Sequence, residues 1–191
     1  MKEKIILIGG GGHCRSVIDV IECEGRFEIY GIVDVKDKIG KKIFEYEIIG
    51  SDEDLYMLFN KVKNALITVG HIYDNSRRVE LFKLCEEIGF IMPNVISPFA
   101  YVSKYASLGK GNVIMHYAVV NAGAKIGNNC IINTRALIEH DVVVEDHCHI
   151  STGAIVNGGT VVRENTFLGS NSVSKEYTEV SGFIKAGSIV K

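Results

Sequence analysis

An aliphatic residue recurs at every sixth position through the second half of the chain. Four residues after most of these positions the side chain is small, as at Ala118, Ala136 and Cys148. A six-residue period fits neither a helix nor an ordinary strand, and it is typical of a β-helix in which each hexapeptide forms one short strand and one corner. The pattern therefore predicts a prism of three-hexapeptide coils with the aliphatic side chains along its axis. These side chains are Ile96, Val102, Leu108, Ile114, Val120, Ile126, Ile132, Ile138, Val144, Ile150, Val156, Val162 and Leu168.

The end of the repeat is irregular. The regular period runs to about Ser172, and its phase fails at Ser174. Residues 175–178 are therefore expected to form a loop, after which Ile184 and Val190 restore a last partial coil.

The first half of the chain carries a different pattern, in which short apolar runs alternate with amphipathic segments. Residues 4–9, 27–34 and 65–69 are predicted to be buried strands. Helices are expected from the glycine run to Gly25, over 52–59 and over about 75–88, the last with Val79, Phe82 and Cys85 inward. This alternation predicts a small parallel sheet of Rossmann-like α/β type. The prolines near residue 95 give the domain boundaries, 1–94 for the α/β domain and 95–191 for the β-helix.

Four consecutive glycines, residues 9–12, lie between the first strand and the first helix and are followed by His13. Backbone N–H groups and a helix N-terminus at one point make a phosphate site. Asp34 closes the second strand, where it can accept hydrogen bonds from a ribose or a base edge. The dinucleotide pattern G-x-G-x-x-G is not completed. A tight turn that uses glycine only for its conformation is therefore the alternative.

A histidine-rich segment lies within the repeat at residues 139–149. Acyl transfer from a thioester to an amine needs a base for the amine proton and a donor facing the carbonyl oxygen. His140 suits the first task, and Asp141 or Glu139 could fix its tautomer. Neighbours on a strand point to opposite faces, so only a corner would bring a carboxylate to the ring. The alternatives are a solvated surface histidine, or a zinc site shared with His147 and His149.

Together these motifs resemble the bacterial nucleotide-aminosugar N-acetyltransferases and sialic acid O-acetyltransferases of the hexapeptide-repeat acyltransferase superfamily. The run N-T-x-x-x-I-E-H-D from Asn133, followed by H-I-S-x-G-A from His149, is similar to the family's active site. The glycine–histidine element is similar to the one in its N-terminal domain. The resemblance implies a left-handed parallel β-helix and a homotrimer with acetyl-CoA in the groove between neighbouring β-helices.

The resemblance also implies roles for individual residues. His140 would be the general base and Asp141 its orienting acid, with Asn133 near the acceptor sugar and His149 near the acyl donor. The chain lacks the family's Gly-x-Pro-Ala-Lys tail, so main-chain amides at Gly158 and Ser170 are expected to contact acetyl-CoA instead. The nucleotide would be held by Gly10, Gly11, His13 and Asp34.

The implied function is an acetyl-CoA-dependent N-acetyltransferase that acts in glycan biosynthesis. The acceptor would be the amine of a nucleotide-linked sugar, a UDP-4-amino-4,6-dideoxy sugar, with direct transfer and no acyl-enzyme. Two alternatives stay open: O-acetylation of a sialic-acid-like sugar, and a non-catalytic β-helix scaffold in glycan assembly.

Composition narrows the partners and the compartment. The net charge of −2 and the absence of a basic run argue against nucleic acid. No apolar run is long enough for a transmembrane span or a signal peptide. Five scattered cysteines indicate reduced thiols in a cytoplasm. No metal is expected, because zinc-type spacing is missing, and Cys130 and Cys148 are interpreted as stacked core fillers.

Overall fold

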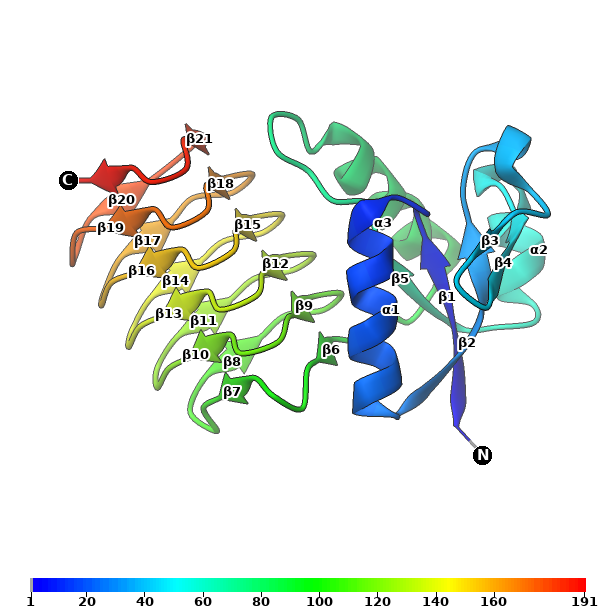
Figure 1. Cartoon of the computed structure of the whole chain (residues 1–191), viewed down its shortest axis with the longest axis horizontal. Helices are drawn as coiled ribbons and strands as arrows, with labels where there is room; N and C mark the ends of the chain where they lie inside the picture. The colour runs from blue at the N-terminus through cyan, green and yellow to red at the C-terminus, as the bar shows by residue number, and fades with distance from the viewer. Residues whose placement is uncertain (1) are drawn as a thin grey trace. The chain divides into compact units, whose positions relative to one another are not determined.

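The computed structural model describes residues 2–191, which divide into two compact units. The first comprises the described residues through Gly70 together with Ser76–Pro93, and the second comprises His71–Asn75 and Asn94–Lys191. Residues 71–75, which the sequence predicts to belong to the α/β domain, make their contacts with the β-helix unit. Figure 1 shows the elements of both units.

The first unit is built on a mostly parallel sheet in the order β3-β4-β2-β1-β5. The three predicted strands are present, and a β3–β4 hairpin that was not predicted extends the sheet beside β2. With only two residues, β3 is too short to produce a recognisable alternation. The strands are β1 (Glu3–Ile8), β2 (Phe27–Val33), β3 (Lys42–Ile43), β4 (Tyr46–Gly50) and β5 (Asn64–Ile67).

Three helices cover the sheet: α1 (Gly12–Glu24), α2 (Leu55–Phe59) and α3 (Ser76–Ile88). Helix α3 buries Arg78 and Leu81 rather than the predicted Val79. The Arg78 guanidinium donates to the carbonyl oxygens of Ile67 and Val69, at 2.7 and 2.8 Å. A charged side chain can take this core position because the end of β5 offers it acceptors. Hydrophobic patterning cannot predict such a residue.

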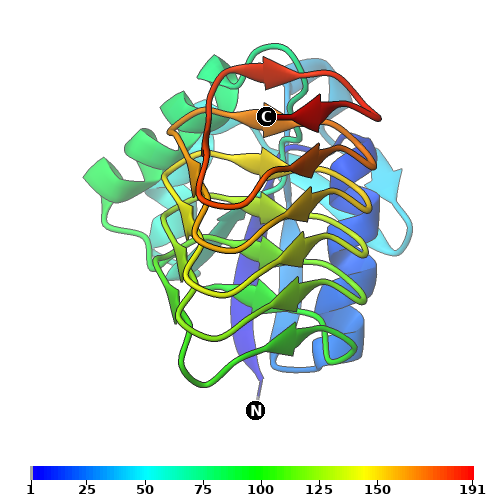
Figure 2. The same ribbon diagram turned by 90° about the vertical axis from the view of Figure 1, so that its left-hand side faces the viewer.

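The second unit is the left-handed parallel β-helix, built from two-residue strands. From β6 to β17, each strand pairs in parallel with the strand 18 residues later, as Ile131 does with His149, whereas β18 and β19 pair with strands 16 residues later. Three sheets form the prism faces, and Figure 2 shows the coils stacked from green to red. The strands are β6 (Val95–Ile96), β7 (Tyr101–Val102), β8 (Ser107–Leu108), β9 (Val113–Ile114), β10 (Val119–Val120), β11 (Lys125–Ile126), β12 (Ile131–Ile132), β13 (Leu137–Ile138), β14 (Val143–Val144), β15 (His149–Ile150), β16 (Ile155–Val156), β17 (Val161–Val162), β18 (Phe167–Leu168), β19 (Val173–Ser174), β20 (Glu179–Val180), β21 (Phe183–Ile184) and β22 (Ile189–Val190).

The prism axis is filled as the period predicts. The aliphatic positions from Ile114 to Leu168 are at most 3% exposed, and the small positions between them are fully buried. Cys130 and Cys148 stack in this core, which confirms their interpretation as core fillers. The Cys130 thiol as a hydrogen-bond partner, together with burial, raises the pKa of Cys148, so this thiol stays protonated.

The corners share one backbone conformation. From residue 117 to residue 177, every sixth residue has a positive φ, whether it is glycine, as at Gly123, or a residue such as Asp141. The predicted phase failure at Ser174 is wrong. Residues 175–178 form an ordinary corner, and the spacing shortens only between β20 and β21, where Ile184 follows Val180 after four positions instead of six.

Among residues 2–191, no helix combines the length and the apolar character that crossing a bilayer requires.

Candidate active site

His140 and Asp141 lie on the corner between β13 and β14. The equivalent corners in neighbouring coils are residues 121–124 and 157–160, and we call this whole edge of the prism the His140 corner. Asp141 has a φ of 59°, and its Oδ2 lies 3.0 Å from His140 Nδ1. The corner thus brings the carboxylate to the ring, as the predicted pair requires. A carboxylate can only accept, so Nδ1 donates to Asp141, and in the neutral ring the lone pair then lies on Nε2. Both side chains are more than half exposed.

Glu139, the other candidate carboxylate, does not contact the ring. Its Oε2 accepts from Asn121 Nδ2 at 2.9 Å and from the His140 backbone N–H at 3.3 Å. Glu139 therefore fixes the turn, and Asp141 alone orients the imidazole.

Gly158 occupies the position of His140 one coil further along the chain. A Cβ atom added to Gly158 would lie 2.6 Å from His140 Nε2 and 2.7 Å from its Cε1. The imidazole therefore packs directly against the glycine backbone. Any larger residue at position 158 would displace the ring, because real Cβ contacts are never this short.

Gly158 is a buried residue, and within residues 2–191 its N–H meets no hydrogen-bond acceptor. In the two preceding coils the equivalent N–H groups are capped: Asn121 Oδ1 accepts from Ala122 at 2.8 Å, and Glu139 accepts from His140. A buried donor without an acceptor calls for an explanation. This donor belongs to the residue against which the His140 ring packs.

Asn133 and Ser170 lie on a different corner of the prism. Asn133 begins the turn between β12 and β13, and Ser170 lies in the equivalent turn between β18 and β19. We call this set of turns the Asn133 corner. Strand β13 separates it from the His140 corner. A single protomer therefore does not bring Asn133 or Ser170 to His140.

His149 lies in β15 and is only 7% exposed. Its Nδ1 lies 2.8 Å from the carbonyl oxygen of His71, and its Nε2 lies 3.0 Å from Asn133 Nδ2. Its ring also packs edge-on against Phe167, at 5.1 Å between ring centroids. Both ring nitrogens are thus already occupied within the β-helix unit.

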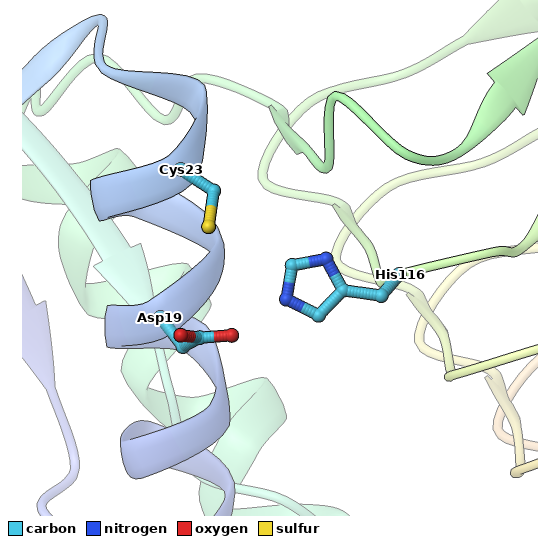
Figure 3. A group of neighbouring side chains, drawn as sticks. All are labelled: Asp19, Cys23 and His116. Carbon is cyan, nitrogen blue, oxygen red and sulfur yellow. The ribbon is translucent and has the colours of Figure 1, made fainter.

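The zinc alternative required His140, His147 and His149 to converge. His147 instead bonds through Nδ1 to Asn129 at 3.0 Å, and no cluster of metal-ligating atoms among residues 2–191 includes any of the three. Elsewhere, Asp19 and Cys23 project from the same face of α1 (Figure 3). This helix alone therefore offers a metal ion only two ligands. His116, drawn in the same figure, bonds within its own unit, with Nδ1 2.7 Å from Ser97 Oγ.

The glycine turn of the first unit forms a cavity of 340 Å³. Its lining brings together all the residues that the sequence predicts for the nucleotide, with the addition of Lys38 beside Asp34. Lys38 was missed because an exposed lysine in a short turn carries no pattern. Its spacing of four from Asp34 was the one available signal. The predicted lining residues are Gly10, Gly11, His13 and Asp34.

Asp34 is held by three donors. Its Oδ1 accepts from the Val35 N–H at 2.7 Å, and its Oδ2 accepts from the Gly10 N–H and from Lys38 Nζ, each at 3.0 Å. Partial burial by itself would raise the pKa of Asp34, but these hydrogen bonds outweigh it and lower the pKa. The carboxylate therefore stays ionised, and it fixes the Gly10 amide at the mouth of the turn.

Gly10→Ala is expected to lower the free energy of unfolding, because its Cβ would lie 2.7 Å from Asp34 Oδ2 and 2.8 Å from Ile43 Cδ1. Gly12→Ala is the matched control, since its Cβ meets no atom within 4 Å. In the first turn of α1 it should stabilise the protein by about 0.4–1 kcal/mol. Urea unfolding of both variants measures the difference. Equal effects would show that the turn is not sterically fixed.

Two family models match the chain: the PglD N-terminal domain over residues 4–84, and the bacterial transferase hexapeptide over residues 105–140. The acetyltransferase domain of PglB from Neisseria gonorrhoeae, solved with acetyl coenzyme A, is 28% identical with a TM-score of 0.88, covering 100% of this chain and 93% of that one. PerB from Caulobacter crescentus, solved with CoA and GDP-perosamine, is 30% identical with a TM-score of 0.91, covering 98% and 88%.

The chain belongs to the hexapeptide-repeat sugar acetyltransferase family. It is therefore an acyltransferase, and the identity extends over both units. WeeI from Acinetobacter baumannii shares the fold, with a TM-score of 0.73 at 17% identity over 96% of each chain. No curated protein sequence matches the chain.

Proposed function

We propose that this protein transfers the acetyl group of acetyl-CoA to the amine of a nucleotide-linked amino sugar, with His140 as general base. The PglB and PerB structures, which contain acetyl-CoA or CoA and in one case GDP-perosamine, support this substrate class. The observation that carries it is the His140–Asp141 pair packed against Gly158, a buried residue whose N–H meets no acceptor among residues 2–191. A base and an oxyanion donor at one point are what acyl transfer needs.

The reaction follows from these positions. The sugar amine attacks the thioester carbonyl carbon, and His140 Nε2 takes a proton from the amine as the C–N bond forms. The Gly158 N–H donates to the oxygen on which negative charge develops. The C–S bond then breaks, and the imidazolium returns the proton to the CoA sulfur. Asp141 stabilises that imidazolium through Nδ1. No acyl-enzyme forms.

A complete site needs two copies of the chain. The His140 corner supplies the base and the Gly158 amide, whereas the residues expected near the sugar and the coenzyme, Asn133 and Ser170, lie on the Asn133 corner. A groove formed by the His140 corner of one protomer and the Asn133 corner of the next brings both sets together. Cyclic symmetry would repeat this contact, and the homotrimer that the resemblance implies would have three such grooves.

The glycine turn holds the nucleotide. The N–H groups at the start of α1 and the Lys38 ammonium supply positive charge for the diphosphate, while His13 and Asp34 line the same cavity. The resemblance implies UDP on a 4-amino-4,6-dideoxy sugar, whereas the PerB structure contains GDP-perosamine. We propose UDP for this protein and place its reaction in the cytoplasm, as a step of glycan biosynthesis.

The test is CoA release from acetyl-CoA with a panel of acceptors: a UDP-linked 4-amino-4,6-dideoxy sugar, GDP-perosamine and free sialic acid. Turnover of the UDP sugar supports the proposal in full, and preference for GDP-perosamine changes only the proposed nucleotide, from UDP to GDP. Turnover of sialic acid alone would replace N-acetylation by O-acetylation. Absence of CoA release with every acceptor, together with absence of acetyl-CoA binding, would favour the non-catalytic scaffold.

A further inference from the structure

His149 is sandwiched between a backbone carbonyl and an amide whose orientations are both defined. The carbonyl oxygen of His71 can only accept, so His149 Nδ1 must carry the proton. Nε2 then has a lone pair and accepts from Asn133 Nδ2. The imidazole is thereby held as one neutral tautomer.

The same contacts fix the amide of Asn133. Its Nδ2 donates to His149 Nε2, and its Oδ1 accepts from the backbone N–H of Thr134 at 2.8 Å. A flipped amide would place Oδ1 against a lone pair and Nδ2 against an N–H group, losing both bonds. His149 therefore determines which way the Asn133 amide points.

The segment His71–Asn75 is in turn anchored on the β-helix by alternate residues. The His71 ring packs against Phe167, and the Tyr73 ring stacks on Phe183 at 4.8 Å between centroids. Asn75 Nδ2 donates to the His147 carbonyl oxygen at 3.2 Å and to Asn165 Oδ1 at 2.8 Å. The His71 carbonyl is thus a fixed acceptor rather than part of a loose loop.

We infer that His149 is a positioning residue for the acceptor side of the site: through Nε2 it orients Asn133, and the anchored segment His71–Asn75 holds it in the required tautomer. This inference rests on the proposed function for the role of Asn133 near the acceptor sugar. It differs from the role that the resemblance implies for His149, a contact with the acyl donor. Both ring nitrogens are bonded within the protein, and the side chain is buried.

Two isosteric variants separate the two ends of the ring. His149→Gln places an amide oxygen near the position of Nε2 and keeps the acceptor for Asn133. His149→Asn places an amide nitrogen near Nδ1 and keeps only the bond to His71. The KM for the nucleotide sugar should rise about tenfold in His149→Asn, the loss of one hydrogen bond, and stay near the wild-type value in His149→Gln. The KM for acetyl-CoA should change in neither.

A double-mutant cycle with Asn133→Ala tests the coupling. If His149 acts through Asn133, the double variant with His149→Asn is no worse than Asn133→Ala alone. Additive effects would overturn the inference, as would equal effects of the Gln and Asn variants or a rise in the KM for acetyl-CoA.

The tautomer gives a measurement that does not depend on activity. Nitrogen-15 spectra of histidine-labelled wild-type protein should show a protonated Nδ1 and an unprotonated Nε2 for His149, assigned by its loss in His149→Gln. The opposite tautomer would overturn the inference even if turnover is normal. Absence of turnover by the wild type with every nucleotide amino sugar would instead overturn the proposed function.

Discussion

His140→Ala is expected to lower kcat by about 10²–10⁴-fold, the usual contribution of a positioned general base. The KM values for acetyl-CoA and for the nucleotide sugar should change little, because the ring acts on the proton that leaves in the transition state. The side chain is exposed and, among residues 2–191, it bonds only to Asp141, so its removal should leave the fold intact.

The measurement is steady-state CoA release with both substrates varied. His116→Ala serves as the matched control, since His116 is a partly exposed histidine one coil before Thr134 and takes part in no step of the proposed reaction. A variant with wild-type kcat would exclude His140 as the base.

The second large effect is expected for Gly158→Ala. The new Cβ would lie 2.6 Å from His140 Nε2, so the imidazole must move by an ångström or more. A misplacement of about that size costs about 10²-fold in rate. The Gly158 N–H remains in this variant, so the loss would come from the position of the base and not from a missing oxyanion donor.

Stability should separate this effect from misfolding. Gly158 does not have a positive φ, and Ala122 occupies the equivalent turn position in an earlier coil, so the backbone accepts alanine. Ala122→Gly is the reverse exchange and the matched control, with kcat expected within about twofold of the wild type. If Gly158→Ala kept full activity with an unchanged melting temperature, the packing of His140 on the glycine would not matter for catalysis.

Periodic features were predictable, and single contacts were not. The six-residue spacing fixes strand positions because a slip by one residue would move Ile138 out of the core. The glycine turn could be placed because its glycines lie between a strand pattern and a helix pattern. The pairing of His140 with Asp141 was conditional on a corner, and the positive φ that makes this corner belongs to a non-glycine residue, which composition does not reveal.

Other parts of the site depend on contacts between residues far apart in the sequence. Gly158 meets His140 only because coils repeat every 18 residues. His149 loses both free ring nitrogens to Asn133 and to the His71 carbonyl, and the latter lies 78 residues away. The placement of Asn133 and His140 on different corners could have been predicted from the period, since the two residues are seven apart and the corners recur every six residues.

The shared corner backbone gives equivalent residues of successive coils a constant spacing along the prism axis. Because each coil repeats the same turn, moving a side chain by 18 residues keeps its direction and shifts it by one strand spacing, about 4.8 Å, along the axis. His140, Gly158 and Glu176 are equivalent residues of three successive coils on one edge of the prism. Insertion of one whole coil between His140 and Gly158 would leave the chain folded but would move the general base one strand spacing further from the proposed oxyanion donor.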